Sequence, residues 1–371
     1  MISMLARLFA AATALVAKGA AGAQYNLQPP QSIIAREIYD LHSLIMWIIL
    51  GIFIVVFGAM AYAIVKHRKS VGHKAEQFHE NTTVEIIWTI IPFFILIGMA
   101  YPATKTVIAM KDTSSPDITI KATGYQWKWG YDYLQEGISF YSNLATPRDQ
   151  IEGRAPKGEH YLLEVDNPVV VPIGKKVRII TTANDVIHSW WVPALGIKQD
   201  AIPGFVRDTW FKVDTPGTYR GQCAELCGKD HGFMPIVVEA VTPEKYAAWV
   251  KQHKQEVAKA AAAEAPGKQW TLDELKSRGE KVYATNCVAC HQASGMGMPP
   301  TFPPLNGSKV ATGPKEAHIS TVLNGRPGTA MASFKQLSDV EIAALITYER
   351  NAWNNKTGDM VTPDEVKALR K

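Results

Sequence analysis

Cysteine is scarce in this chain, with four residues among 371, and they fall into two close pairs. If each pair serves a metal or a cofactor, none is left for a structural disulfide framework. Charge of one sign is also lacking, because the net charge of +5 is mild and no basic run is long enough to indicate binding of nucleic acid. These shortages exclude a disulfide-stapled scaffold and a nucleic-acid partner.

Apolar residues make up 47% of the chain, and much of this content lies in two blocks. Transmembrane helices are predicted over about residues 41–65 and 84–109, because crossing a bilayer takes roughly 20 apolar residues. A buried helical hairpin of a soluble protein is the alternative, which the length of uninterrupted apolar sequence disfavours. The intervening loop has an excess of lysine and arginine, which places it in the cytoplasm and both tails outside.

Residues 1–23 have the pattern of a secretory signal: Arg7, an apolar core and a small-residue cleavage site at 21–23. The alternative is an uncleaved anchor helix, although the core is shorter than the roughly 20 residues that span a bilayer. Export agrees with both tails lying on the outer side of the membrane.

Short β-rich runs dominate from about residue 117 to 240. They alternate apolar with polar residues and are broken by Gly and Pro; they cover 117–124, 160–165, 175–183, 209–221 and 235–241. This predicts an all-β sandwich or barrel, with residues 134–160 as a polar surface loop. Tyr125, Trp127 and Trp129 would share one face if their stretch is a strand.

A cluster of soft ligands occupies residues 223–234, which read CAELCGKDHGFM. It offers two thiolates, an imidazole and a thioether, from Cys223, Cys227, His231 and Met234, and His188 upstream supplies a second imidazole. This ligand set suits copper in electron transfer. A disulfide and a zinc site are the alternatives. A disulfide leaves the methionine and the histidines without a role, and zinc has no use for a thioether.

The remaining segment divides into a connection and a second redox unit. Residues 243–267 are predicted as a helix, with Thr242 as its cap and Pro243 at its first position, that fades into an Ala-rich linker. A Cys-x-x-Cys-His haem attachment motif then occupies residues 287–291.

The haem motif assigns each of its residues a role. The thiols of Cys287 and Cys290 would add to the haem vinyl groups, and His291 would bind the iron. A redox dithiol is the alternative, but a thioredoxin-like context is absent. Met331 is expected as the second axial ligand, because Met296 and Met298 follow the motif too closely to reach the opposite haem face.

Together these motifs resemble cytochrome c oxidase subunit II, of the haem-copper oxidase family, with a fused class I cytochrome c. The resemblance implies a multidomain chain: a two-helix transmembrane hairpin, an all-β cupredoxin-like sandwich and an all-α class I cytochrome c domain. The expected divisions are a signal peptide (1–23), an N-terminal segment with the two transmembrane helices (24–112), a dicopper domain (113–242), a helix and linker (243–267) and a cytochrome c domain (268–371).

The resemblance also implies residue roles. In that family two cysteines bridge two copper ions; here the side-chain ligands would be His188, Cys223, Cys227, His231 and Met234, and Glu225 would bind through its backbone carbonyl. The Glu225 side chain would approach a magnesium ion shared with subunit I. Trp127 would be the electron-entry residue, and the carbonyl of Pro304 would orient His291. Glu85 would lie at the entrance of a proton path, although Thr82 and Glu85 also form a capping-box pattern.

The function implied is that of the electron-entry subunit of a respiratory terminal oxidase. Electrons would pass from a donor through haem c and the dicopper centre to subunit I, which reduces oxygen, so this chain needs no acid, base or nucleophile. The expected partners are subunits I and III, membrane lipids and a donor such as cytochrome c or another redox protein. The expected location is the bacterial inner membrane, as a multi-pass protein with both termini and the redox domains on the periplasmic side.

Two other functions are alternatives to this one. The electron-entry subunit of a dicopper nitric oxide reductase would have a similar sequence, because the difference lies in the partner subunit; Glu85 favours the oxygen reductase. A membrane-anchored copper carrier would not need the haem motif.

Overall fold

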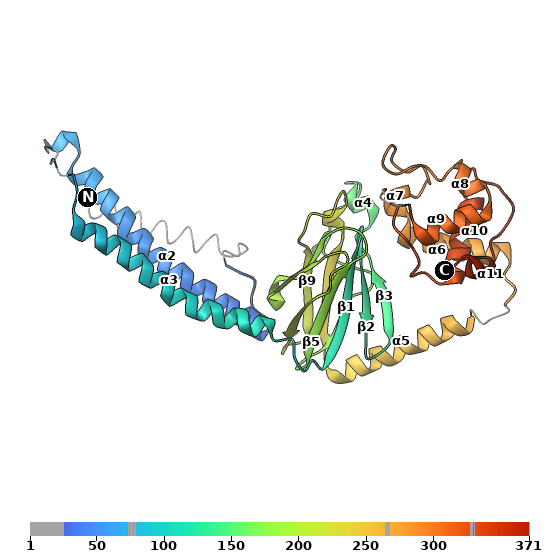
Figure 1. Cartoon of the computed structure of the whole chain (residues 1–371), viewed down its shortest axis with the longest axis horizontal. Coiled ribbons are helices and arrows are strands. Elements are labelled where there is room, and N and C mark those ends of the chain that lie inside the picture. Colours follow the sequence, from blue (N-terminus) through green and yellow to red (C-terminus); the bar gives the residue numbers. More distant parts are fainter. Residues whose placement is uncertain are drawn as a thin grey trace.

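The computed structural model describes residues 26–72, 74, 77, 79–263, 268–326, 329 and 331–370. The predicted signal peptide, residues 1–23, lies outside this range. Figure 1 shows three parts in chain order: a pair of long helices, a β-sandwich and a helical domain beside the sandwich. The predicted fold class is confirmed.

The helix pair consists of α2 (Ile33–Lys66) and α3 (Thr82–Lys111), which lie side by side in Figure 1. Both are long and apolar enough to cross a membrane. They extend beyond the predicted spans 41–65 and 84–109, because polar residues at the ends continue the helices. The predicted cap of α3 was wrong by one residue: Asn81, not Thr82, accepts a hydrogen bond from the Val84 amide at 3.2 Å.

Several hydrogen bonds tie these helices to the sandwich. The Ser32 hydroxyl at the start of α2 donates to the Leu195 carbonyl at 2.7 Å, and the Gln31 amide donates to the Ala194 carbonyl at 2.8 Å. The Trp210 indole donates to the Ala109 carbonyl near the end of α3 at 3.0 Å. The membrane anchor and the sandwich are therefore joined by more than the connecting chain.

Two five-stranded sheets form the sandwich. The first has the order β3 (Ile138–Ser142), β2 (Lys128–Tyr133), β1 (Ile118–Tyr125), β5 (Lys176–Ala183) and β8 (Arg207–Lys212). The second has the order β4 (Val169–Pro172), β10 (Pro235–Val241), β9 (Gly217–Cys223), β6 (His188–Val192) and β7 (Ile197–Ala201). β1 and β5 are parallel, as are β4 and β10, and the other paired strands are antiparallel.

Large aromatic side chains fill the space between the sheets. Trp129, Tyr131, Trp190 and Phe211 are buried, and the Trp190 indole donates to the Tyr131 hydroxyl across the core at 3.1 Å. Burying such side chains supplies much of the hydrophobic stabilisation, and each buried indole or phenol polar group needs a partner. The result is a rigid frame whose strand ends can hold ligands in place.

Three sequence-based assignments in this region were wrong. Residues 160–165 form turns rather than a strand, and only Val165 makes a bridge, to Leu144. β3 lies inside the stretch 134–160, which the sequence predicts to be a surface loop. The stretch with Tyr125, Trp127 and Trp129 is a hairpin, with the turn at 126–127, so the three side chains do not follow one strand.

Helix α5 (Pro243–Ala263) continues through the predicted Ala-rich linker as far as it is described. Its first turn receives the expected cap, since the Lys245 amide donates to the Thr242 hydroxyl at 3.4 Å. Trp249 packs against Tyr133, with ring centroids 5.1 Å apart. Figure 1 shows α5 running along the sandwich toward the helical domain.

The helical domain contains α6 (Leu272–Asn286), α7 (Val288–His291), α8 (Lys309–Thr312), α9 (Lys315–Asn324), α10 (Asp339–Asn351) and α11 (Pro363–Leu369). The expected packing of the first long helix on the last one is present between α6 and α10. Gly279 permits it, because a Cβ there would lie 2.0 Å from the Ala344 carbonyl oxygen. The predicted capping box of Ser338 and Glu341 opens α10.

Short helices complete the described parts of the chain: η1 (Lys69–Val71), α4 (Arg148–Ile151), η2 (Pro193–Leu195) and η3 (His231–Phe233).

Candidate metal centre

Three strand ends of one sheet meet at the copper-type ligand cluster. His188 begins β6, Cys223 ends β9, and the loop from residue 224 to 234 leads into β10. This loop carries Cys227, His231 and Met234. Since β9 pairs with both β6 and β10, the sheet register brings residues 35 positions apart in sequence to one end of the sandwich.

The ligand atoms converge in two groups around the two thiols. The Sγ atoms of Cys223 and Cys227 are 3.9 Å apart. Around Cys223 Sγ lie the Nδ1 atom of His188 at 3.9 Å and the carbonyl oxygen of Glu225 at 3.4 Å. The Cys223 thiol thus has one imidazole and one carbonyl oxygen beside it.

The second group surrounds Cys227. The Nδ1 atom of His231 lies 3.4 Å from Cys227 Sγ, and the thioether of Met234 lies 3.5 Å from it. Cys223 and Cys227 are both free cysteines, so the structure has no disulfide between them. A thioether within the cluster fits copper better than zinc.

Asp185 orients the buried imidazole of His188, a role that the sequence analysis missed. Its Oδ1 atom lies 2.8 Å from His188 Nε2, which leaves Nδ1 facing Cys223. A carboxylate on the second nitrogen of a histidine ligand fixes its orientation and tautomer. Gly124 provides the space, because a Cβ there would lie 2.6 Å from the imidazole ring. The only signal in the sequence was an aspartate three positions before the histidine.

Electrostatics at the two thiols favour metal binding. The hydrogen bond between the two thiols lowers the pKa of Cys223, and the same contact together with burial raises the pKa of Cys227. Because a bound metal needs deprotonated ligands, metal binding at this pair would release protons. A thiolate, rather than a thiol, is the form that binds a metal.

Glu225 lies at the edge of this cluster with its carboxylate engaged by a lysine. Its Oε1 atom accepts a hydrogen bond from Lys198 Nζ at 3.0 Å, and the same ammonium lies 3.3 Å from Asp200 Oδ1. The predicted magnesium role of the side chain stays a prediction.

Trp127 lies against the copper-type loop and is only 9% exposed. Its indole donates to the Cys227 carbonyl at 3.1 Å, and its ring meets Phe302 of the helical domain at 6.5 Å between centroids. The resemblance implies that electrons enter at Trp127, and here the fused domain lies against its ring.

The haem-type motif lies at the end of α6 and in α7. Cys287, Cys290 and His291 follow one another on a single turn, and both thiols are free. Burial raises the pKa of Cys290 to about 11 and that of Cys287 well above its usual value. Both are therefore neutral thiols at pH 7.

His291 is oriented by Pro303 rather than by the predicted Pro304. Its Nδ1 atom donates to the Pro303 carbonyl at 3.0 Å, which leaves Nε2 for iron. The sequence FPPLNG offers adjacent prolines, and the pattern alone selected the wrong one. This orientation of the imidazole fits a haem bound through His291.

The three candidate methionines lie in different surroundings. Met298 accepts a hydrogen bond from Lys229 of the sandwich at 3.0 Å, and Met296 is exposed. Met331 is half-buried, and its carbonyl accepts a hydrogen bond from the Arg326 amide at 2.9 Å. Met331 stays the predicted second axial ligand.

Glu85 lies in the first turn of α3, and Figure 1 shows that α3 starts at the end of the helix pair that points away from the sandwich. Its Oε1 atom accepts a hydrogen bond from the Asn81 amide at 3.4 Å. A capping role for Glu85 is thus present, and its role in a proton path stays a prediction.

Comparison with protein families gives three matches. The description "Cytochrome C oxidase subunit II, periplasmic domain" matches residues 118–241, and "Cytochrome C oxidase subunit II, transmembrane domain" matches residues 20–106. The description "Cytochrome C oxidase, cbb3-type, subunit III" matches residues 274–348, which include the haem-type motif.

Curated relatives cover the first two parts of the chain. Cytochrome c oxidase subunit 2 of Metridium senile is 42% identical over 61% of this chain and 89% of its own length. The subunit of the same name from Cereibacter sphaeroides is 38% identical over 61% of this chain and 79% of its own length. Among solved structures, the periplasmic domain of subunit II of cytochrome oxidase of Bradyrhizobium japonicum is 45% identical, covering 38% of this chain and 96% of that chain with a TM-score of 0.35.

Proposed function

The chain belongs to the cytochrome c oxidase subunit II family, and we propose that it passes electrons from a donor through haem c and a dicopper centre to subunit I. It is an electron-entry subunit with a cytochrome c-type domain, and its relatives are parts of an oxidoreductase, the haem-copper oxidase. Reduction of oxygen to water is assigned to subunit I.

Two copper ions would be held by His188, Cys223, Cys227, His231, Met234 and the carbonyl of Glu225. When bound, the pair supplies a one-electron redox site. The protein contributes rigidity, because His188 and Cys223 are fixed in paired strands and Asp185 orients the first imidazole. Ligands that barely move let the site change its charge with little rearrangement.

Haem c would be attached through Cys287 and Cys290 and bound at iron by His291 and Met331. When bound, it supplies a second one-electron site. The Pro303 carbonyl holds the imidazole in place, and Trp127, against the copper loop, is the proposed entry residue for electrons that reach the copper centre.

The membrane segment anchors the chain, and the copper domain is periplasmic. We further propose a multi-pass arrangement in the bacterial inner membrane with both termini outside, a signal peptide over residues 1–23, and domain limits at 112, 242 and 267. Contacts with subunit III, a magnesium ion at Glu225 and a proton-path role for Glu85 belong to the same proposal.

The observation that carries this function is the convergence of six copper-type ligands at one end of the sandwich. The test is the visible spectrum of the purified complex together with its turnover of oxygen and of nitric oxide. We expect mixed-valence copper bands, a haem c band and turnover of oxygen. Turnover of nitric oxide alone would assign the chain to a nitric oxide reductase, and a spectrum without haem c would indicate a copper carrier.

A further inference from the structure

The helical domain contacts the sandwich through a lysine that points out of the copper domain. Lys128, the first residue of β2, donates to the Asn286 side chain at 2.5 Å and to the Thr285 carbonyl at 3.4 Å. Both acceptors lie at the C-terminal end of α6. Lys128 is only 6% exposed, so this contact is a buried one rather than a surface ion pair.

The chemistry of this contact explains how a buried lysine is tolerated. The last carbonyls of a helix have no partner inside the helix and carry partial negative charge, which a cation stabilises. The Tyr141 ring adds a cation–π contact, 4.2 Å from the ammonium to the centroid. Burial lowers the pKa of Lys128 to about 8, so the group is still an ammonium ion at pH 7.

A second contact between the domains involves the residue next to Lys128 in the chain. The Trp127 ring meets the Phe302 ring edge-on, at 6.5 Å between centroids and 81° between planes. In the helical domain, both contacts lie next to residues of the proposed haem site. Asn286 precedes Cys287, and Phe302 precedes Pro303.

A continuous route of contacts follows from these pairs. On the haem side, His291 donates to the Pro303 carbonyl, and Phe302 is bonded to Pro303. On the copper side, the Trp127 indole donates to the carbonyl of Cys227. The ring contact between Phe302 and Trp127 joins the haem side of the route to the copper side.

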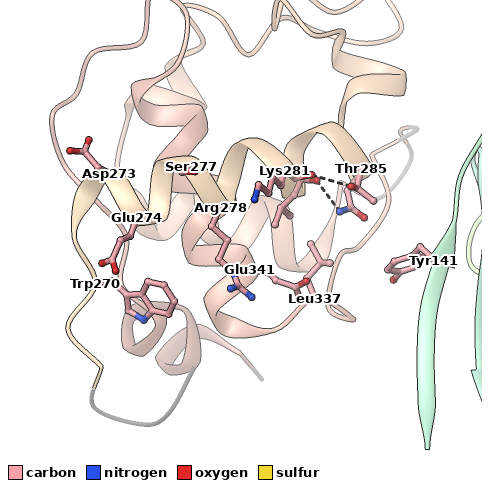
Figure 2. A pocket seen from close by; sticks show the side chains of 12 residues that line it. Tyr141, Trp270, Asp273, Glu274, Ser277, Arg278, Lys281, Thr285, Leu337 and Glu341 are labelled. Atoms are coloured by element: carbon pink, nitrogen blue, oxygen red, sulfur yellow. Dashed lines mark hydrogen bonds between the residues drawn. The ribbon is translucent and has the colours of Figure 1, made fainter. Parts of the chain in front are cut away.

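Beside these contacts the two domains separate. A cleft lies between Tyr141 of the sandwich and residues of α6 such as Arg278, Lys281 and Thr285 (Figure 2). Its volume is about 780 Å³. The cleft reaches the acceptors of Lys128, since Thr285 and Asn286 line it. Beside the cleft, the two domains are connected by the contacts of Lys128 and Trp127 and by the hydrogen bond from Lys229 to Met298.

We propose that Lys128 is a positioning residue: by holding the C-terminal end of α6 it sets Phe302 against Trp127 and so completes the route from His291 to Cys227. The proposal rests on the proposed function, because it needs both cofactors. With both cofactors bound, this route would carry one electron at a time from the group held by His291 to the pair held by Cys227 and its neighbours, and no bond or proton would change place. A consequence is that an external donor reduces the helical domain, since this domain covers Trp127.

The test compares Lys128→Met with Lys121→Met in the full chain within the assembled complex. Lys121 lies on the neighbouring strand β1 and pairs with Asp132 at 3.3 Å, so the control removes the same charge outside the interface. The first measurement is the magnetic relaxation of the oxidised copper pair, which nearby ferric haem accelerates. The second is the rate of electron transfer after light-triggered reduction of the haem.

For Lys128→Met we expect normal copper and haem bands, slower relaxation of the copper signal and electron transfer slowed roughly tenfold or more, because small misplacements of reacting groups cost large factors. Lys121→Met should match the unchanged chain in both measurements. Phe302→Leu should keep the relaxation rate and slow electron transfer alone, since it removes a ring from the route but leaves the lysine contact.

Unchanged relaxation and an unchanged rate in Lys128→Met would overturn the proposal, and so would a lost magnetic coupling with an unchanged rate. If that variant does not load its cofactors, Asn286→Ala removes the acceptor from the opposite side and is judged by the same two outcomes. Absence of copper or haem from the unchanged chain would instead contradict the proposed function.

Discussion

The two cysteine pairs of this chain lie in opposite electrostatic surroundings. At the end of the sandwich, contact with Cys227 lowers the pKa of Cys223, so a thiolate is available for a metal. In the helical domain, burial raises the pKa of Cys287 and of Cys290, so both are neutral thiols. The same residue type thus lies beside a second thiol that lowers the pKa of Cys223 in one place, and in a buried site that raises the pKa of both thiols in the other.

The two regions also differ in how their ligands are assembled. The copper-type ligands come from the ends of paired strands and meet only because the sheet register brings His188 to Cys223. The haem-type residues are consecutive in sequence, and a single turn of helix presents them. A site of the first kind depends on the whole sandwich, whereas one of the second kind depends on local structure and on the bound group.

The largest expected effect tests whether the two sites are independent. His291→Ala removes the proposed axial ligand, so we expect the normal haem c spectrum to be lost while the copper bands remain. The measurement is the visible spectrum of the purified complex, with His160→Ala, in the loop after α4, as the control. Loss of both cofactors together would show that the two regions do not load separately.

A smaller effect is expected from the residue that orients His188. Asp185→Ala removes the acceptor at 2.8 Å from the imidazole, and loss of such a partner typically weakens metal affinity by about 10- to 100-fold. Titration of the copper-depleted protein against a chelator measures this. Asp214→Ala, which breaks only an exposed ion pair with Arg36, is the control. Equal affinities in the two variants would contradict the assigned role.

Removal of the thioether should change the copper site without emptying it. In Met234→Leu the volume is kept and a soft, weak ligand is lost, so we expect shifted copper bands, slower electron delivery and an unchanged haem band. Copper content and the absorption spectrum are measured on the same sample. A copper spectrum identical to that of the unchanged chain would argue strongly against Met234 as a ligand.

The smallest expected effect concerns the stability of the helical domain alone. Arg350 holds Asp359 by two contacts of 2.7 Å, and its hydrogen bond lowers the pKa of Asp359 from 3.8 to about 2. Because the folded-state pKa is lowered, the stabilisation is present above about pH 4 and is lost as the pH falls through 2. Asp359→Asn should therefore cost about 1 kcal/mol near pH 7, a value reduced by the 36% exposure of the carboxylate.

This last effect is measured as the free energy of unfolding of the helical domain, followed by the haem absorption, at several pH values. The difference in free energy of unfolding between the variant and the unchanged chain should shrink toward pH 2. The copper bands should be the same in the variant and the unchanged chain at each pH. A difference that is constant from pH 7 to pH 2 would show that ionisation of Asp359 is not its source.

Features carried by local sequence were predictable. The apolar blocks indicated both long helices, and the Cys-x-x-Cys-His motif indicated the haem-type turn. The copper-type ligands were assigned through the family resemblance, and the structure brings His188 to the cysteines as expected.

What escaped prediction depends on contacts that a sequence pattern does not encode. The turn between β1 and β2 contains no Gly or Pro. The sequence therefore carries no turn signal between Tyr125 and Trp129, and a single strand is the pattern that it favours. Asp185 and Pro303 act through the direction of single hydrogen bonds. Lys128 meets its acceptors only because two domains of the chain lie against each other.

The most direct test of the central claim, that this chain carries both a copper pair and a covalent haem, is elemental analysis of the purified, membrane-extracted polypeptide. The account predicts about two copper atoms and about one iron atom per chain, given the ligand sets of the two sites. A polypeptide with neither copper nor iron would contradict it.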